Sequence, residues 1–377
     1  MSTRQNEPMI PMANLAAQHE RLQQHIEDSV CSVLRSGAYI LGQNVSNFEN
    51  DIAALCGVRH AIGVGNGTDA LLLALMAIGV GPGDEVITCP FTFVATVETV
   101  VLLGAKPVFV DIDPATFTMD AEQLAEKITN RTKAIIPVHL FGQIADLRSV
   151  YALVKHHGIA IIGDAAQAIA STQDNLPLGQ LADMSTLSFY PTKNLGAAGD
   201  GGMIVTDDDN LAEQLRILRF HGSKGTYNYQ TVGVCSRLDA LQAAILSVKL
   251  THLLEWTDQR RKHAALYLDA FADIDELILP RTLSGNHHTY HQFTLSIKQG
   301  KRDALKEYMH LKGISTGIFY PIALHLAPAY TDIVEGYVGQ FPHSEAACRN
   351  VLSIPVHPEL KSSECTRVID VVRSFWS

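Results

Sequence analysis

The sequence predicts an α/β protein with a mainly parallel, seven-stranded sheet, followed by a smaller C-terminal α+β domain. Short, nearly continuous apolar segments alternate with helical patterns from residue 60 to residue 206. This alternation is typical of a parallel sheet that is covered by helices on both faces. Beyond residue 209 the alternation stops. We therefore expect a large domain over residues 1–254 and a small domain over residues 255–377.

The individual elements follow from apolar runs and from helical spacing of apolar residues. Strands are expected at residues 60–64, 85–88, 106–110, 133–138, 159–162, 185–188 and 202–206. Helices are expected at residues 15–35, 43–56, 70–80, 95–103, 120–128, 147–157 and 211–220. Near and beyond the domain junction we expect a long helix, a strand and another helix, at residues 238–256, 292–297 and 344–351.

Charge and hydropathy restrict the partners. The 377 residues include 29 basic and 39 acidic side chains, a net charge of -10 that argues against a nucleic-acid surface. The longest apolar run, residues 70–80, is too short to cross a bilayer and predicts a buried helix. Neither nucleic acid nor membrane is expected as a partner.

Cysteine usage and the first residues predict a cytoplasmic protein. The six cysteines are scattered without a Cys-x-x-Cys pair, and residues 1–5 lack the apolar core of a signal peptide. We expect reduced thiols, and no metal ligand is predicted.

Lys193 lies in an unusually uncharged stretch, with no other charged residue between Asp183 and Asp200. Most lysines lie on solvated surfaces among mixed charges. Apolar surroundings lower the pKa of a lysine, and the neutral amine is then able to form a Schiff base. This setting predicts a lysine that holds pyridoxal phosphate (PLP).

A glycine turn follows the first expected strand. Residues 65–68 read Gly-Asn-Gly-Thr and open a helix, whose free N–H groups and positive dipole end suit a phosphate. A plain tight turn is the structural alternative. A dinucleotide fingerprint with Gly63, Gly65 and Glu85 is a third reading, but Thr68 stands where its last glycine belongs.

Further candidate residues follow other strands, where ligands of parallel sheets gather. Asp164 is either a helix N-cap or the carboxylate that keeps a pyridine nitrogen protonated. Gln167, one turn later, is a surface residue or a hydrogen-bond partner of the ring oxygen. Phe93 is a core residue or a stacking partner of the ring. Ser188 caps a turn or reaches the same phosphate as Thr68.

Taken together and in order, these motifs resemble the DegT/StrS-like family of PLP-dependent sugar-nucleotide aminotransferases, which have fold type I. The resemblance runs from about Ile10 to Leu360. The motifs that carry it are residues 66–71, 91–96, 164–167, 188–196 with 199–202, and 236–244.

The resemblance implies a role for each residue. Lys193 matches the Schiff-base lysine, Asp164 the partner of the pyridinium nitrogen, and Gln167 the neighbour of the ring oxygen. The phosphate ligands and the aromatic over the ring match Gly67, Thr68, Ser188 and Phe93. The residues that are expected to contact a substrate are Arg237, Tyr320 and His325, and packing or surface roles are the alternatives for the last two.

The resemblance also implies a homodimer whose active sites are completed across the interface. Two positions depart from the family pattern. Cys235 stands where many members have an asparagine that reaches the neighbouring subunit's cofactor phosphate, and a thiol is a poor donor. Phe319 stands where many relatives have a histidine before the tyrosine.

The implied reaction moves an amino group from L-glutamate to a nucleotide-linked keto sugar. Pyridoxamine phosphate carries the amino group between the two half-reactions, and 2-oxoglutarate leaves after the first. The stretch around Lys193 looks closer to enzymes of 3-keto sugars, and the product is an amino sugar for a glycan, such as lipopolysaccharide O-antigen, or for a secondary metabolite. The alternatives are a 4-keto sugar-nucleotide or cyclitol aminotransferase and a non-enzymatic ligand-sensing regulator.

Overall fold

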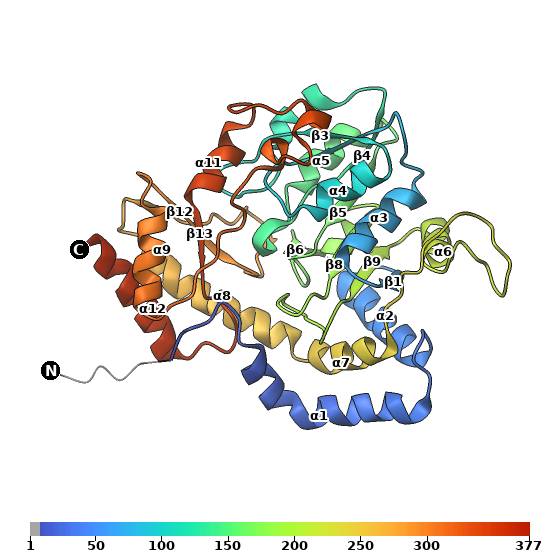
Figure 1. The fold of residues 1–377 in the computed structure, drawn as a ribbon, viewed down its shortest axis with the longest axis horizontal. Coiled ribbons are helices and arrows are strands. Elements are labelled where there is room, and N and C mark those ends of the chain that lie inside the picture. Colours follow the sequence, from blue (N-terminus) through green and yellow to red (C-terminus); the bar gives the residue numbers. More distant parts are fainter. Residues whose placement is uncertain (1–7) are drawn as a thin grey trace.

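The computed structural model describes residues 8–377, and its larger part is built on one seven-stranded sheet (Figure 1). The strand order is β1-β9-β8-β5-β4-β2-β3. β9 runs antiparallel to both of its neighbours, and all other neighbouring pairs are parallel. The strands are β1 (His60–Val64), β2 (Glu85–Thr88), β3 (Lys106–Phe109), β4 (Thr132–Ile135), β5 (Ala160–Asp164), β8 (Met184–Ser188) and β9 (Gly202–Thr206). The expected mainly parallel sheet is confirmed.

Both faces of this sheet are buried, which explains why its strands are apolar throughout. Successive side chains point to opposite faces, so the neighbours Ile161 and Ile162 belong to different apolar clusters. The helices that pack into the cluster of Ile161 include α2 (Gln43–Cys56), α5 (Leu147–Val154) and α7 (Ala240–Leu250). The helices that pack into the cluster of Ile162 include α3 (Gly67–Ala77), α4 (Ala95–Leu102) and α6 (Asp209–Leu218).

Helix α1 (Leu15–Ser36) lies alongside α7 at the edge of the large part (Figure 1). Asn14 caps it by accepting from the Ala17 N–H, and Gly37 ends it in the left-handed conformation that glycine adopts readily. Its apolar stripe packs Leu22 and Ile26 against Trp256.

A second core lies in the C-terminal part. The antiparallel strands β10 (Leu277–Ile278), β12 (Phe293–Ile297) and β13 (Val351–Ile354) pack with α8 (Leu253–Ala270), α9 (Arg302–Leu311) and α12 (Ser362–Trp376). Ile10 also packs in this core. The smaller elements are β6 (Thr172–Gln173), β7 (Leu176–Pro177), β11 (Asn286–His287), α10 (Thr331–Val334), α11 (Pro342–Asn350), η3 (Leu140–Gly142), η4 (Leu178–Gln180) and η5 (Leu324–Leu326). The domain boundary after residue 254 stays a prediction.

Two expected helices are wrong. Residues 120–128 form two short 3-10 turns, η1 (Ala121–Gln123) and η2 (Ala125–Lys127), instead of one helix. Leu124 is the one fully buried residue there, so no apolar stripe supports a longer helix. The single helix over 238–256 is α7 and α8, separated at Thr251 and His252. The Thr251 hydroxyl donates to a backbone carbonyl of the preceding turn, a bond that competes with helix continuation.

Among the residues from 8 onward, no helix is both long and apolar enough to cross a bilayer.

Candidate active site

A cavity of about 650 Å³ opens at the carboxyl ends of the sheet strands, the place where ligands of parallel sheets bind. The segments after β1, β2, β4, β5 and β8 line it on one side, and segments 291–292 and 319–320 line it on the other. Eight of the ten predicted site residues line this cavity, namely Gly67, Thr68, Phe93, Asp164, Gln167, Ser188, Lys193 and Tyr320.

One end of the cavity suits a phosphate. A Cβ on Gly67 would lie 2.7 Å from Ser188 Cβ, so only glycine allows this approach at the start of α3. The N–H groups of Gly67 and Thr68 make no hydrogen bond with a described residue. Ser188 Oγ accepts from the Tyr190 N–H at 3.3 Å, which leaves its O–H free to donate. These donors and the helix dipole match the phosphate of PLP.

Lys193 follows β8 on a turn in which its N–H donates to Tyr190 O at 2.8 Å. The side chain is partly exposed, and it lines the cavity. Burial lowers the pKa of Lys193 to about 8, against the opposing attraction of Asp164. A much larger fraction of this amine is therefore neutral near pH 7 than of an ordinary lysine, as a Schiff-base nucleophile requires.

Asp164 ends β5 and is buried. Burial raises the pKa of its carboxyl, while hydrogen bonds from Thr96 and Ala166 and the charge of Lys193 act in the opposite direction. A protonated pyridine nitrogen would favour the ionised carboxylate further. The residues present therefore fit the ring of PLP as well as its phosphate.

Thr96 contacts the Asp164 carboxylate, and sequence reasoning gave it no separate role. Its hydroxyl donates to Asp164 Oδ2 at 2.8 Å, and its oxygen lies 3.0 Å from Thr92 Oγ1. Because the Thr96 hydrogen is already given to Asp164, Thr92 donates to Thr96. The two hydroxyls form a chain of hydrogen bonds that orients the Asp164 carboxylate. The sequence signal for this pair was the spacing of four residues between two threonines beside Phe93.

Aromatic and amide groups also line the cavity. Gln167 Oε1 accepts from the Phe141 N–H at 2.7 Å, and Gln167 Nε2 donates to the Tyr320 hydroxyl at 3.1 Å. The second hydrogen of Nε2 remains for a ligand oxygen. Phe93 is 54 % exposed, and its ring centroid lies 6.1 Å from that of Tyr320. Burial raises the pKa of Tyr320, so its hydroxyl stays protonated.

The structure does not bring Arg237 and His325 to the cavity. Arg237 donates to Cys235 Sγ at 2.9 Å and lies over the Phe220 ring. His325 is fully buried, with Nε2 3.2 Å from Glu345 Oε1. Within one chain, neither side chain is placed to contact a substrate in the cavity, which differs from the expectation. Both side chains contact other residues of the chain instead.

His291 and Gln292 line the cavity without having been predicted. His291 Nδ1 lies 3.2 Å from the side-chain oxygen of Asn194, the residue after Lys193. No motif pointed to this segment, because it is nearly one hundred residues further along the chain.

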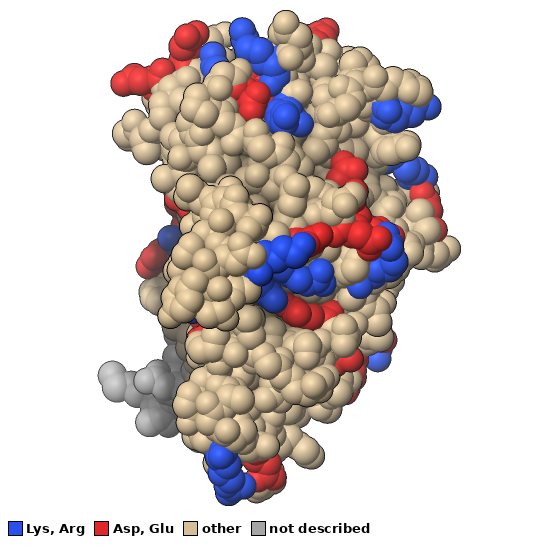
Figure 2. Space-filling view, turned by 90° about the vertical axis from the view of Figure 1, so that its right-hand side faces the viewer, with Lys and Arg blue, Asp and Glu red and all other residues tan. Residues whose placement is uncertain are grey.

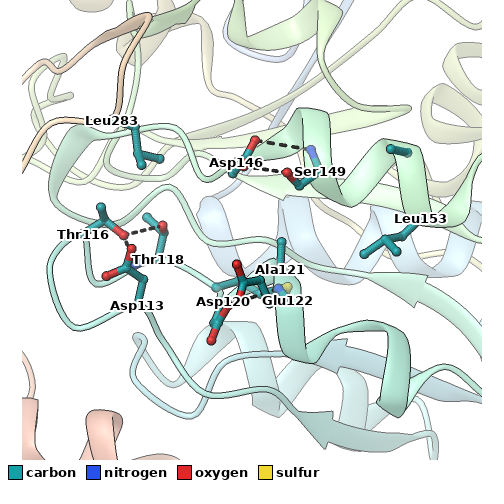
Figure 3. A pocket seen from close by; sticks show the side chains of 12 residues that line it. Asp113, Thr116, Thr118, Asp120, Ala121, Glu122, Asp146, Ser149, Leu153 and Leu283 are labelled. Atoms are coloured by element: carbon teal, nitrogen blue, oxygen red, sulfur yellow. Dashed lines mark hydrogen bonds between the residues drawn. The ribbon is translucent and has the colours of Figure 1, made fainter.

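A second cavity, of about 450 Å³, contains several carboxylates but no free set of converging groups (Figure 3). Asp146 bonds to Ser149, and Asp113 and Asp120 accept from backbone N–H groups of their own turns. In the part of the chain from residue 8, no group of three or more His, Cys, Asp or Glu side chains is placed to hold a metal ion.

Comparison with known proteins agrees with this geometry. The sequence model described as "DegT/DnrJ/EryC1/StrS aminotransferase family" matches residues 20–373. The chain is 48% identical over 370 residues to a pleiotropic regulatory protein of Geobacillus stearothermophilus, covering 97% of this chain and 98% of that protein. It is 43% identical over 364 residues to a UDP-N-acetyl-3-dehydro-alpha-D-glucosamine 3-aminotransferase of Acidithiobacillus ferrooxidans, covering 97% of each.

Solved structures show the same fold. DesV of S. venezuelae, in complex with a ketimine intermediate, matches with a TM-score of 0.95 and 40% identity over 98% of this chain and 99% of that chain. NtdA from Bacillus subtilis, with the bound cofactor PMP, matches with a TM-score of 0.89 and 30% identity over 99% of this chain and 86% of that chain. The chain belongs to the DegT/DnrJ/EryC1/StrS aminotransferase family, as its motifs predicted.

Proposed function

We propose that this protein is a PLP-dependent aminotransferase that moves an amino group from L-glutamate to the 3-keto group of a nucleotide-linked sugar. The observation that carries the proposal is one cavity in which Lys193, Asp164 and the Gly67 turn meet. The 3-keto preference is supported by the name of the Acidithiobacillus relative.

Each part of PLP has a partner in this cavity. The N–H groups of Gly67 and Thr68 and the hydroxyl of Ser188 would hold the phosphate, and Asp164 would hold the proton on the ring nitrogen. When bound, PLP supplies an electron sink for the carbanion that forms at the donor α-carbon. Phe93 lines the cavity and would cover one face of the ring.

Lys193 Nζ is the group that moves protons. With a pKa of about 8 it is near the optimum for both taking and returning a proton close to neutral pH. It would take the proton from the α-carbon of glutamate and pass it to the carbonyl carbon of the cofactor in the first half-reaction. In the second it would move a proton in the opposite direction, onto the sugar carbon.

The charges of the cavity support a homodimer with shared sites. Glutamate and a nucleotide diphosphate are both anionic, yet Lys193 is the one Lys or Arg side chain in the described lining. A second copy would supply the missing positive charge.

The surface beside α6 offers a face for that second copy. The loop after α6 extends away from the body (Figure 1) and exposes Tyr227, Tyr229 and Val232 by 83, 64 and 85 %. On the face drawn in Figure 2, basic and acidic side chains lie close together across the middle of a surface that is otherwise largely uncharged.

A two-step experiment tests this proposal. The purified protein should show a visible absorption band that borohydride abolishes, with the reduced cofactor on the Lys193 peptide. A panel of UDP- and dTDP-linked 3-keto and 4-keto sugars with glutamate should then yield an amino sugar, identified by mass and NMR. Cofactor attached to another lysine would refute the assignment of Lys193.

A ligand-sensing regulator is the second candidate, because the Geobacillus relative is named a pleiotropic regulatory protein. A bound cofactor without turnover of any sugar in the panel would favour it. The cytoplasmic location stays a prediction.

A further inference from the structure

Lys249 is a buried lysine that the proposed mechanism leaves without a role. It lies near the end of α7 and is 8 % exposed. Lysine is rarely buried to this extent unless its amine has a partner. Burial lowers the pKa of Lys249, against the opposing attraction of Glu359. Burying this amine therefore costs free energy, and an apolar side chain would fill the same space without that cost.

The partner of Lys249 is a backbone carbonyl in the turn that carries Lys193. Lys249 Nζ donates to Gly196 O at 2.7 Å. Gly196 is buried, and its carbonyl accepts no other hydrogen bond from a described residue. A buried carbonyl without a partner is costly. Lys249 therefore satisfies a group that the connection between β8 and β9 leaves unpaired.

Gly196 lies where this turn closes on itself. A Cβ at residue 196 would overlap Pro191 O, so only glycine allows these two residues to approach so closely. Lys193 lies between them in the chain. The orientation of the Gly196 peptide therefore determines the direction in which the backbone leaves the turn, and with it the place from which the Lys193 side chain starts.

A second side chain of α7 holds the same connection. Gln242 lies seven residues before Lys249 and so on the same face of the helix. Its Oε1 accepts from the Ala198 N–H at 2.9 Å. The helix itself is anchored, because Ala243 and Leu246 pack into the apolar cluster on one face of the sheet. A fixed helix therefore presents one acceptor and one donor to the segment that follows Lys193.

We propose that Lys249 is a positioning residue, which holds the turn through Gly196 O and so orients the amine of Lys193. The inference rests on the role proposed for Lys193. Proton transfer is sensitive to displacements of about 1 Å, and a turn whose carbonyl has lost its partner has more conformations available. Without the bond from Lys249, Lys193 would stay attached to the same turn but would be placed less precisely.

Two substitutions separate a donor from a packing residue. Lys249→Met removes the donor and keeps the apolar stem, whereas Lys249→Arg keeps a charged donor. In Lys249→Met, kcat should fall about 10-fold with little change in KM for either substrate, because the lost bond orients the lysine and not the substrate. Lys249→Arg should recover part of this loss. A packing role predicts the reverse order, so a higher kcat in Lys249→Met than in Lys249→Arg would overturn the proposal.

Hydrogen–deuterium exchange in the apoprotein gives a readout that does not depend on turnover. The Lys193 amide donates to Tyr190 O at 2.8 Å within the turn, and the Phe189 amide donates to Gly201 O at 2.8 Å. In Lys249→Met the Lys193 amide should exchange about 10-fold faster, while the Phe189 amide keeps its rate, because only the turn is loosened. Equal acceleration of both amides would mean a general loss of stability and would refute the positioning role.

Ser29→Ala is the matched control. Ser29 Oγ, on α1, donates to Ala244 O of α7 at 3.4 Å. This variant loses a side-chain bond to the same helix without affecting the turn, so kcat and both exchange rates should equal those of the unaltered protein. If borohydride fixes the cofactor to Lys193 but Lys249→Met keeps the full kcat and the original exchange rate, this inference alone fails. Cofactor on another lysine would refute the proposed function instead.

Discussion

The two sides of the cavity are built in different ways. On the sheet side, Gly67, Asp164 and Ser188 lie at strand ends and helix starts. Many of the hydrogen-bond donors on this side are backbone N–H groups. On the opposite side, His291 and Tyr320 come from connecting segments and act through side chains. The difference separates the proposed cofactor site, which the strand ends of the sheet fix, from the proposed substrate side, which lies on connecting segments that vary more readily.

The largest effect is expected on the sheet side at Lys193. Lys193→Ala should lower transamination at least about 10³-fold, because both the covalent attachment and the proton transfer are lost. Lys155→Ala, at an exposed lysine, is the control and should retain full rate. Rates are measured as 2-oxoglutarate formed from glutamate. Substantial transamination by Lys193→Ala would show that Lys193 is not the residue that holds PLP and moves the proton.

The next effect concerns the buried carboxylate. Asp164→Asn keeps an acceptor for Thr96 but no longer holds a proton on the ring nitrogen, and kcat should fall about 10²-fold. Asp146→Asn, in the second cavity of Figure 3, should leave kcat unchanged because Asp146 only caps a helix. Equal losses in both variants would mean that the two cavities are not functionally distinct.

A smaller effect, on the affinity for PLP, is expected at Gly67, where the backbone closely approaches Ser188. Gly67→Ala places a methyl group 2.7 Å from Ser188 Cβ and should raise the dissociation constant of PLP at least about 10-fold. Gly81→Ala adds a methyl group in open space and should leave it unaltered. Absorbance titration of the apoprotein with PLP measures both. Unchanged affinity in Gly67→Ala would show that the turn adjusts.

Two buried histidines, His139 and His288, should make the free energy of unfolding decrease at acid pH. Burial lowers the pKa of His139, which lines the cavity, and of His288, which does not, to about 3. The unfolded chain therefore binds these protons first, and stability present above about pH 6.5 is lost as the pH falls towards 3. His288→Asn should reduce the change in unfolding free energy between pH 5 and pH 7 by about 2 kcal/mol, an average of about 1 kcal/mol per pH unit, in chemical denaturation. If the unfolding free energy of His288→Asn changed with pH as it does in the unaltered protein, this prediction would be wrong.

The smallest effect on activity is expected at His325. Its ring is buried against Glu345 and Phe341, so His325→Gln should cost about 1–3 kcal/mol of unfolding free energy. The ratio kcat/KM should change less than about 3-fold. A large rise in KM for the sugar substrate would instead restore the expected substrate contact.

The sheet and the cofactor side were predictable because their signals are short and contiguous. Apolar strands identified all seven members of the large sheet. Asp164 ends a strand, and Gly67 and Lys193 lie within five residues of a strand end. The expected helix at 120–128 failed because helical spacing without a buried stripe gives only short turns. His291 was missed because its place at the cavity depends on folding of the C-terminal part against Asn194, which no local pattern encodes.

The antiparallel strand β9 has a consequence for how firmly Lys193 is held. Because β9 returns directly beside β8, the connection that carries Lys193 begins and ends on two paired strands. Phe189 N bonds to Gly201 O at 2.8 Å, and Ala197 N bonds to Phe189 O at 2.8 Å. Opening this loop would therefore require separation of the sheet itself. In hydrogen–deuterium exchange, the amides of Phe189 and Ala197 should exchange as slowly as those of the central strands, which is unusual for a reactive loop.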